Sequence, residues 1–218
     1  MRRSVFSFAC ALAGVVCCAL AAQPPSQPPA GTPPGSTAAQ PPAPGRGGGR
    51  GRGSIQTMTL SGPWTDGGTI PAAFSQAEGD VSPALTWAGP PDGIVSFVLV
   101  VHDLDAPIAG GADDLLHWLL WNIPGSARSL TQHLPQGATL GDGSRQISAT
   151  GPNYRGPAAP ASGPPHHYVF ELYALDTMID VPAVGQPPAQ TRAAVMTAMA
   201  GHVRAKGVIV GLYKRTGG

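Results

Sequence analysis

The sequence predicts a mainly β domain that follows an N-terminal export signal and a linker. Short β-rich runs bounded by Gly, Pro, Asp and Ser recur throughout residues 55–218. Glycine and proline are concentrated before them, with nine prolines and eight glycines between residues 23 and 53. Only one segment of the domain combines a helical spacing of apolar residues with the absence of proline. Together these observations indicate one folded unit, long enough to bury a substantial core.

The first 22 residues have the pattern of a secretory signal peptide. Arg2 and Arg3 precede an uncharged apolar stretch, and small residues come before the proline-rich segment. We expect cleavage after Ala21 or Ala22. An uncleaved N-terminal anchor is the alternative, because the stretch is close to the roughly 20 residues that span a bilayer.

The cysteines of the chain all lie inside this expected signal. The residues before Cys17 fit a lipobox poorly, so the pattern favours a free mature protein over a lipoprotein. Cleavage would leave no thiol and no disulfide in the mature chain. We therefore expect a periplasmic or secreted protein that is stabilised by its core alone. The cysteines are Cys10, Cys17 and Cys18.

Residues 23–54 are expected to be a disordered linker, because almost no large apolar side chain is available to offset the entropy of ordering. Arg46, Arg50 and Arg52 make its second half cationic. Five of the 13 basic residues precede the domain, which leaves eight against 12 acidic residues within it. A mildly acidic domain argues against nucleic acid as a partner, since binding a phosphate backbone requires a basic face.

The domain itself, residues 55–218, is expected to contain six strands and one long helix. The helix is predicted from about Ala189 to Ala205, where apolar residues recur at helical spacing after two prolines. Residues 138–163 contain few apolar residues and many Gly and Pro, so they are expected to form a long surface loop of the kind that often carries function. The strands are predicted at Ile55–Leu60, Val81–Trp87, Val95–Asp103, His117–Ile123, His167–Leu175 and Val208–Tyr213.

Ionisable residues gather where two of these strands end or begin. Asp103 and Asp105 follow the most apolar strand, and residues two apart on an extended chain point to the same side, so we expect a local carboxylate pair fixed by Pro107. His117 begins another strand, and prolines deliver His166 to the start of a third. The histidine-bearing segments are expected to meet at one end of the sheet.

Three kinds of site are compatible with this pattern. An anion pocket would use imidazole and backbone donors, with the aspartates orienting the imidazoles. A zinc site would use His117 and His166 with a carboxylate. A carboxylate–histidine pair could perform general acid–base catalysis. Spacing alone does not decide among them.

Five separated blocks, in order, resemble the phosphatidylethanolamine-binding protein (PEBP) family, and more narrowly its bacterial, kinase-inhibitor-like branch. The resemblance implies an antiparallel β-sandwich with peripheral helices, including a C-terminal one. It also implies a small pocket at one end that holds phosphate, acetate or a phospholipid headgroup. The blocks are Pro83–Trp87, Ser96–Pro107, His117–Pro124, Tyr154–Pro157 and His166–Asp176.

Carried over by position, the resemblance assigns eight ligand-binding residues. Two neighbouring positions depart from the family pattern. Leu104 replaces a proline, which loosens the turn, and His167 replaces an arginine, which makes a permanent charge titratable. We therefore expect anion affinity to rise as pH falls through the histidine range; a flat profile between about pH 5 and 8 would refute this. The eight residues are Asp103, Asp105, Pro107, His117, Gly156, Pro157, His166 and Tyr168.

The sequence thus predicts an exported binding protein with no catalytic activity, no cofactor and no bound metal. Its expected ligand is a small anion or a phosphorylated headgroup. One alternative is a protein-interaction module that inhibits a protease or kinase, as the resemblance suggests; export makes a protease the better partner. The other is a metal-dependent hydrolase built on His102, His117, His166 and the aspartates.

Overall fold

The computed structural model describes residues 55–217. The expected signal peptide, residues 1–22, and nearly all of the expected linker, residues 23–54, lie outside the described residues and stay predictions. Within the described part of the chain, no helix is long and apolar enough to cross a bilayer.

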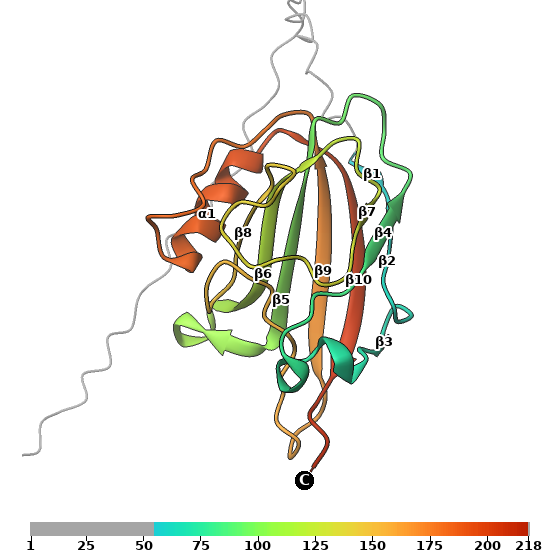
Figure 1. The fold of residues 1–218 in the computed structure, drawn as a ribbon, viewed down its shortest axis with the longest axis vertical. Helices are drawn as coiled ribbons and strands as arrows, with labels where there is room; N and C mark the ends of the chain where they lie inside the picture. The colour runs from blue at the N-terminus through green and yellow to red at the C-terminus, as the bar shows by residue number, and fades with distance from the viewer. Residues whose placement is uncertain (1–54, 218) are drawn as a thin grey trace, which may run out of the picture. The chain divides into compact units, whose positions relative to one another are not determined.

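Four long antiparallel strands form the centre of a seven-stranded sheet (Figure 1). Their order across the sheet is β10, β9, β5 and β6, and their apolar runs make the buried middle of the domain. Short strands extend both edges: β1 and β3 pair in parallel with β10, and β8 pairs with β6. The bounds are β1 Gln56–Thr57, β3 Gly68–Thr69, β5 Ser96–Ile108, β6 Asp113–Pro124, β8 Arg145–Ile147, β9 His166–Leu175 and β10 Val203–Tyr213.

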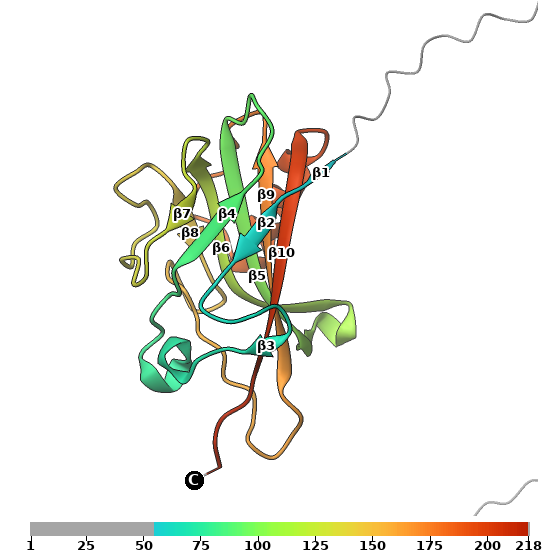
Figure 2. The ribbon, with the colours of Figure 1, turned by 90° about the vertical axis from the view of Figure 1, so that its right-hand side faces the viewer.

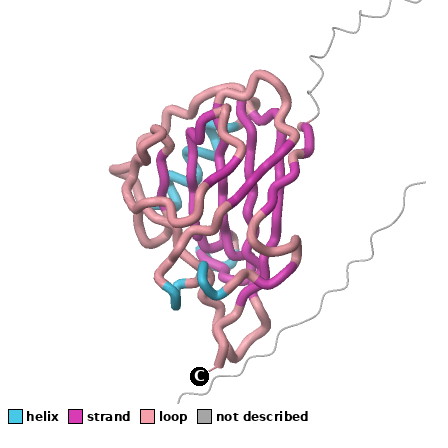
Figure 3. Tube along the Cα trace, turned by 45° about the vertical axis from the view of Figure 1, so that its right-hand side comes forward, coloured by secondary structure: helices cyan, strands magenta, loops and turns pink. Residues whose placement is uncertain are grey.

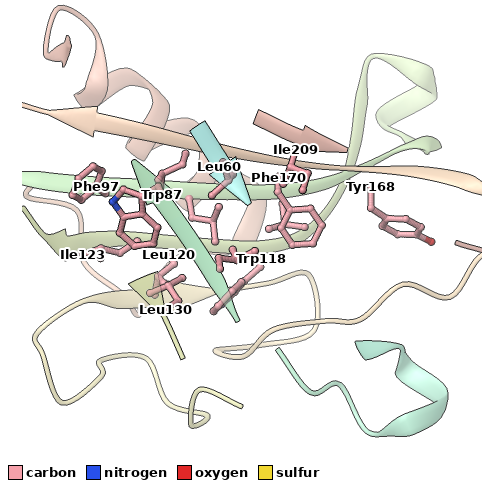
Figure 4. Packing of buried hydrophobic residues seen from close by; sticks show 14 of the residues in the cluster. Leu60, Trp87, Phe97, Trp118, Leu120, Ile123, Leu130, Tyr168, Phe170 and Ile209 are labelled. Carbon is pink, nitrogen blue, oxygen red and sulfur yellow. The ribbon is translucent and has the colours of Figure 1, made fainter. Parts of the chain in front are cut away.

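A second, three-stranded sheet packs on one face of the main sheet (Figure 2). Its apolar residues alternate with exposed ones, as expected for strands with one wet face. Trp87 packs edge-on against Phe97 of β5, with ring centroids 5.2 Å apart. The core between the two sheets contains most of the buried aromatic side chains (Figure 4). The strands of this sheet are β2 Thr59–Ser61, β4 Leu85–Ala88 and β7 Ser129–Leu130.

Helix α1, Pro188–Met199, covers the opposite face of the main sheet (Figure 3). Val195 and Met199 are buried in a second apolar cluster with Trp121. The predicted helix end at residue 205 is wrong: α1 stops at Met199, Gly201 adopts a left-handed φ of 85°, and β10 begins two residues later. Three short 3-10 helices lie in the connections: η1 Ala72–Phe74, η2 Gln76–Glu78 and η3 Ala109–Gly111.

The predicted fold class, a mainly β domain with peripheral helices, is confirmed. Each of the six predicted strand runs overlaps a strand, although most bounds differ, and in Val81–Trp87 only the last three residues belong to β4. The strands β3, β7 and β8 were not predicted because they are only two or three residues long. The expectation of a plain surface loop over residues 138–163 is wrong. That segment contains β8 and buries Gln146, Ile147 and Tyr154.

Replacing Phe170 by alanine tests whether the inter-sheet core stabilises the domain. Phe170 is 1% exposed, and its ring centroid lies 5.0 Å from the ring centroid of Trp64. We expect Phe170→Ala to lower the free energy of unfolding by about 3–5 kcal/mol, measured by chemical denaturation. The exposed Val208 on β10 is the control, and Val208→Ala should change stability by no more than about 0.5 kcal/mol. Equal effects of the two substitutions would contradict this description of the core.

Candidate functional site

A pocket of about 120 Å³ lies at one end of the inter-sheet core. Tyr168 marks this end, and its hydroxyl points away from the other core residues in Figure 4. Strands β5, β6 and β9 contribute one part of the lining, the loop that precedes β9 contributes another, and η2 contributes Gln76. The lining residues are Gln76, Asp103, Ala106, Leu115, His117, Arg155, Ala158, Ala159, Pro160, His166 and Tyr168.

Asp103 is the buried centre of the site. Its side chain is only 4% exposed, and a buried carboxylate needs hydrogen-bond donors to offset its lost hydration. His166 Nδ1 lies 3.1 Å from its Oδ1 and 2.9 Å from its Oδ2. The backbone N–H of Asp105 donates to Oδ1 at 3.0 Å. The His166 contacts link β5 to the first residue of β9, and the Asp105 bond lies within β5.

His117 is held by reciprocal hydrogen bonds with Arg155. Its Nδ1 lies 2.8 Å from the Arg155 carbonyl, and the Arg155 N–H donates to the His117 carbonyl at 3.0 Å. A carbonyl only accepts, so the Nδ1 nitrogen carries the hydrogen. Burial lowers the pKa of His117, which favours the neutral ring with a lone pair on Nε2. That Nε2 atom is buried, has no hydrogen-bond partner among residues 55–217, and lies 3.9 Å from Asp103 Oδ2.

Tyr168 presents a protonated phenol to the same pocket. Its oxygen accepts hydrogen bonds from the backbone N–H groups of Ala158 and Ala159, both at 3.2 Å. Burial raises the pKa of Tyr168, and the nearby Asp103 carboxylate adds to this shift. The rings of His117 and Tyr168 meet edge to face with centroids 5.0 Å apart. The phenol therefore fixes the loop that precedes β9 and also packs against His117.

Arg155 is a pocket residue to which sequence reasoning assigned no role. Its block, residues 154–157, was part of the family resemblance, but whether its guanidinium lines a pocket depends on the path of the loop. Among the described residues it forms no ion pair, and its Nε is buried without a hydrogen-bond partner. Arg155 thus adds a cationic residue to the pocket lining, and it has one buried donor that no described residue satisfies.

Two of the predicted residues lie outside the pocket. Asp105 pairs with His167 on the exposed side, with Asp105 Oδ2 2.8 Å from His167 Nδ1. The hydrogen bond from the His167 backbone lowers the pKa of Asp105. Pro107 borders a separate hollow with Leu104. The expected pair of carboxylates on one side is therefore wrong, because the register of β5 against β6 shifts between Asp103 and Pro107.

Gly156 and Pro157 also do not line the pocket; they shape the loop behind it. The Gly156 N–H donates to Asp80 Oδ1 at 2.7 Å, and a Cβ at this position would lie 2.4 Å from the Phe74 carbonyl oxygen. Only glycine permits so close an approach of two backbone segments. The Pro157 carbonyl accepts from the N–H of Gln76 at 3.2 Å.

His102 is directed away from the pocket. Its Nδ1 lies 2.5 Å from Asp114 Oδ2, and its Nε2 lies 3.7 Å from Glu171. Burial favours the neutral ring of His102, but the neighbouring carboxylates of Glu171 and Asp114 favour the charged ring more strongly. The pKa of His102 is therefore raised. His102 does not share a site with His117 and His166, contrary to what the hydrolase alternative had expected. No group of three His, Cys, Asp or Glu residues within 55–217 is arranged to hold a metal ion.

Fold and site together define a class of protein: a β-sandwich domain with a small pocket, lined in part by histidine, aspartate, arginine and tyrosine, at the end of its main sheet. Residues 61–214 match the family model described as phosphatidylethanolamine-binding protein. The chain belongs to the phosphatidylethanolamine-binding protein family, as the motif blocks indicated.

Relatives from distant organisms support this membership. A UPF0098 protein of Methanothermobacter thermautotrophicus is 36% identical over 154 residues, which cover 70% of this chain and 95% of that protein. LppC of Mycobacterium tuberculosis, whose name assigns it provisionally to the lipoproteins, is 34% identical over 162 residues, 72% of this chain and 75% of LppC. The crystal structure of Escherichia coli YbcL, described as a new member of the mammalian PEBP family, has 25% identity and a TM-score of 0.59. The match covers 73% of this chain and 99% of YbcL.

The protonation state of His117 can be measured directly. By NMR titration of ¹⁵N-labelled histidines, we expect the pKa of His117 to lie below its ordinary value of 6.5, with the hydrogen of the neutral ring on Nδ1. Asp103→Asn should lower this pKa further, because the Asp103 carboxylate favours the charged ring. A His117 pKa above 6.5, or one that rises in Asp103→Asn, would contradict the described electrostatics.

Proposed function

We propose that this chain is an exported binding protein, without catalytic activity, whose pocket takes a small anion or a phosphorylated headgroup. The observation that carries the proposal is a pair of buried nitrogen atoms on two residues that line the pocket, Arg155 Nε and His117 Nε2, which have no hydrogen-bond partner among residues 55–217. A buried polar atom without a partner costs free energy, so a ligand that pairs with both atoms gains that energy on binding.

The size and polarity of the pocket agree with such a ligand. Its volume of about 120 Å³ is well below the roughly 300–1,000 Å³ of sites for drug-sized molecules, so the ligand, or the part of it that enters, is small. Arg155 offers charged donors. A guanidinium matches the paired oxygens of phosphate or carboxylate.

The hydrogen bonds of the two pocket histidines favour binding over catalysis. The Nδ1 atoms of His117 and His166 face a backbone carbonyl and the Asp103 carboxylate, which fixes both rings. The residues that line the pocket include no serine, threonine or cysteine that would act as a nucleophile. This lining suits ligand orientation.

Export is supported by two observations outside the pocket. The first 22 residues have the charge and apolar pattern of a secretory signal. The relative LppC is named provisionally as a lipoprotein, which agrees with a place in the cell envelope. We therefore assign the mature chain to the periplasm or the exterior.

An NMR titration of the full chain with O-phosphoethanolamine tests the proposed function. In the presence of EDTA, which removes stray metal ions, we expect saturable shifts confined to residues 103–117, 155–160 and 166–168. His166→Ala should abolish them, because it removes a lining ring and a hydrogen bond to Asp103.

His202→Ala is the matched control, since His202 is exposed and its Nδ1 faces Asp176 outside the pocket lining. This variant should bind as the original chain does. Absence of shifts at millimolar ligand, or identical binding by the His166→Ala protein, would contradict the proposed function.

A further inference from the structure

A cluster of alternating charges crosses the face of the main sheet that helix α1 covers, and His102 is its middle member. Only 8% of His102 is exposed. Its Nδ1 atom lies 2.5 Å from Asp114 Oδ2 on β6, and its Nε2 atom lies 3.7 Å from Glu171 Oε2 on β9. One buried ring on β5 therefore stands between carboxylates of the two neighbouring strands.

Two permanent cations close the ends of this cluster. Arg192 of α1 donates to Asp114 Oδ1 at 2.6 Å, and Lys206 of β10 donates to Glu171 Oε1 at 2.5 Å. Between them, His102 is the member whose ordinary pKa lies near neutral pH. In the neutral range, the charge of the whole cluster therefore depends on whether His102 holds a proton.

The charges of the cluster balance only when His102 is protonated. Asp113, at the surface, also pairs with Arg192 at 3.1 Å. The Tyr173 hydroxyl donates to Glu171 at 2.8 Å, and burial together with this carboxylate raises the pKa of Tyr173, so the phenol stays neutral. A neutral His102 leaves one anion in excess inside a partly buried cluster. The cations are protonated His102, Arg192 and Lys206, and the anions are Asp113, Asp114 and Glu171.

The neutral ring of His102 can serve only one of its two carboxylates. An imidazole carries one N–H when neutral and two when charged. Whichever nitrogen keeps the hydrogen, the other presents a lone pair to a carboxylate, which only accepts. The Nε2 atom is buried and has no hydrogen-bond partner among residues 55–217, so water does not reach it to relieve this contact. Loss of the proton therefore replaces an attraction between strands by a contact of two acceptors.

We propose that His102 is a proton-operated latch that ties β5 to both β6 and β9. Uptake of one proton balances the charges of the cluster and gives each of the two carboxylates a donor. Release of the proton leaves one carboxylate opposite a lone pair. The latch lies outside the pocket, whose lining does not include His102, so this inference does not depend on what the pocket binds. An exported domain, as proposed above, would meet the pH of its surroundings.

The latch should stabilise the folded domain in a defined pH range. Burial favours the neutral ring, but the carboxylates of Glu171 and Asp114 favour the charged ring more strongly, so the pKa of His102 lies above its ordinary value of 6.5. Stabilisation by such a group is complete below the pKa of the unfolded chain and is lost as pH rises through the pKa of the folded chain. Between the two values, its contribution should raise the unfolding equilibrium constant about tenfold per pH unit.

NMR titration of ¹⁵N-labelled histidines in the full chain tests the charge of the latch. The pKa of His102 should lie above 6.5. Glu171→Gln should lower it, because a neutral amide no longer favours the charged ring and can donate to the lone pair of Nε2. Asp176→Asn is the matched control, since Asp176 lies beside the exposed His202, and it should leave the pKa of His102 unchanged. A His102 pKa at or below 6.5, or one that Glu171→Gln does not lower, would overturn the proposal.

Chemical denaturation of the full chain between about pH 6 and about pH 9 tests the effect of the latch on stability. The stability advantage of the original chain over His102→Gln should shrink as pH rises, because only the original chain has this proton to lose. His202→Gln should show no comparable trend, since His202 and its partner Asp176 lie at the surface, where solvent screens their charges. Parallel pH profiles of the original chain and His102→Gln would overturn the proposal. The NMR titration decides it even where His102→Gln does not fold.

Discussion

The buried carboxylate of Asp103 is the constraint around which this end of the domain is built. It lies at the end of the apolar core, where only ordered donors can replace its lost hydration. His166 and the Asp105 N–H provide them and thereby join β5, its bulge and the start of β9. This junction also positions the loop before β9. Tyr168 lies two residues after His166, and its hydroxyl oxygen accepts hydrogen bonds from backbone N–H groups of that loop. The pocket lies among the residues that these bonds hold in place.

Strand β5 separates two polar systems with different roles. Successive residues point to opposite faces, so His102 faces helix α1 while Asp103 faces the pocket. On the helix side, alternating charges continue from His102 to Asp114 and Arg192, and from His102 to Glu171 and Lys206. The bond with His102, and then that with Lys206, lowers the pKa of Glu171 to about 2. Each charge there lies within 4 Å of an opposite charge, which suits a structural role. In the pocket, Arg155 forms no ion pair with any residue of 55–217.

The sequence was most informative where a physical pattern is continuous. The apolar run of β5 and the alternation in β9 predicted strands, and the order of motif blocks predicted which histidines share a pocket with Asp103. Asp105 was misplaced because a shift of register, which depends on pairing with β6, interrupts the alternation. Arg155 was missed because its position depends on two hydrogen bonds between its backbone and His117, one to the ring and one to the carbonyl, and His117 is 38 positions away. The sequence could not predict the unpaired Nε2 acceptor of His117 for the same reason, because only tertiary contacts decide which ring nitrogen carries the hydrogen.

The central claim is that one pocket, lined by Arg155, His117 and the buried Asp103, takes a small anion. A high-resolution crystal structure of the full chain with inorganic phosphate tests it most directly. The geometry predicts phosphate in the pocket, with oxygen atoms at hydrogen-bond distance from the Arg155 guanidinium and a further oxygen at that distance from His117 Nε2. Phosphate bound only at the surface, or bound in the pocket with Arg155 turned away from it, would contradict the claim.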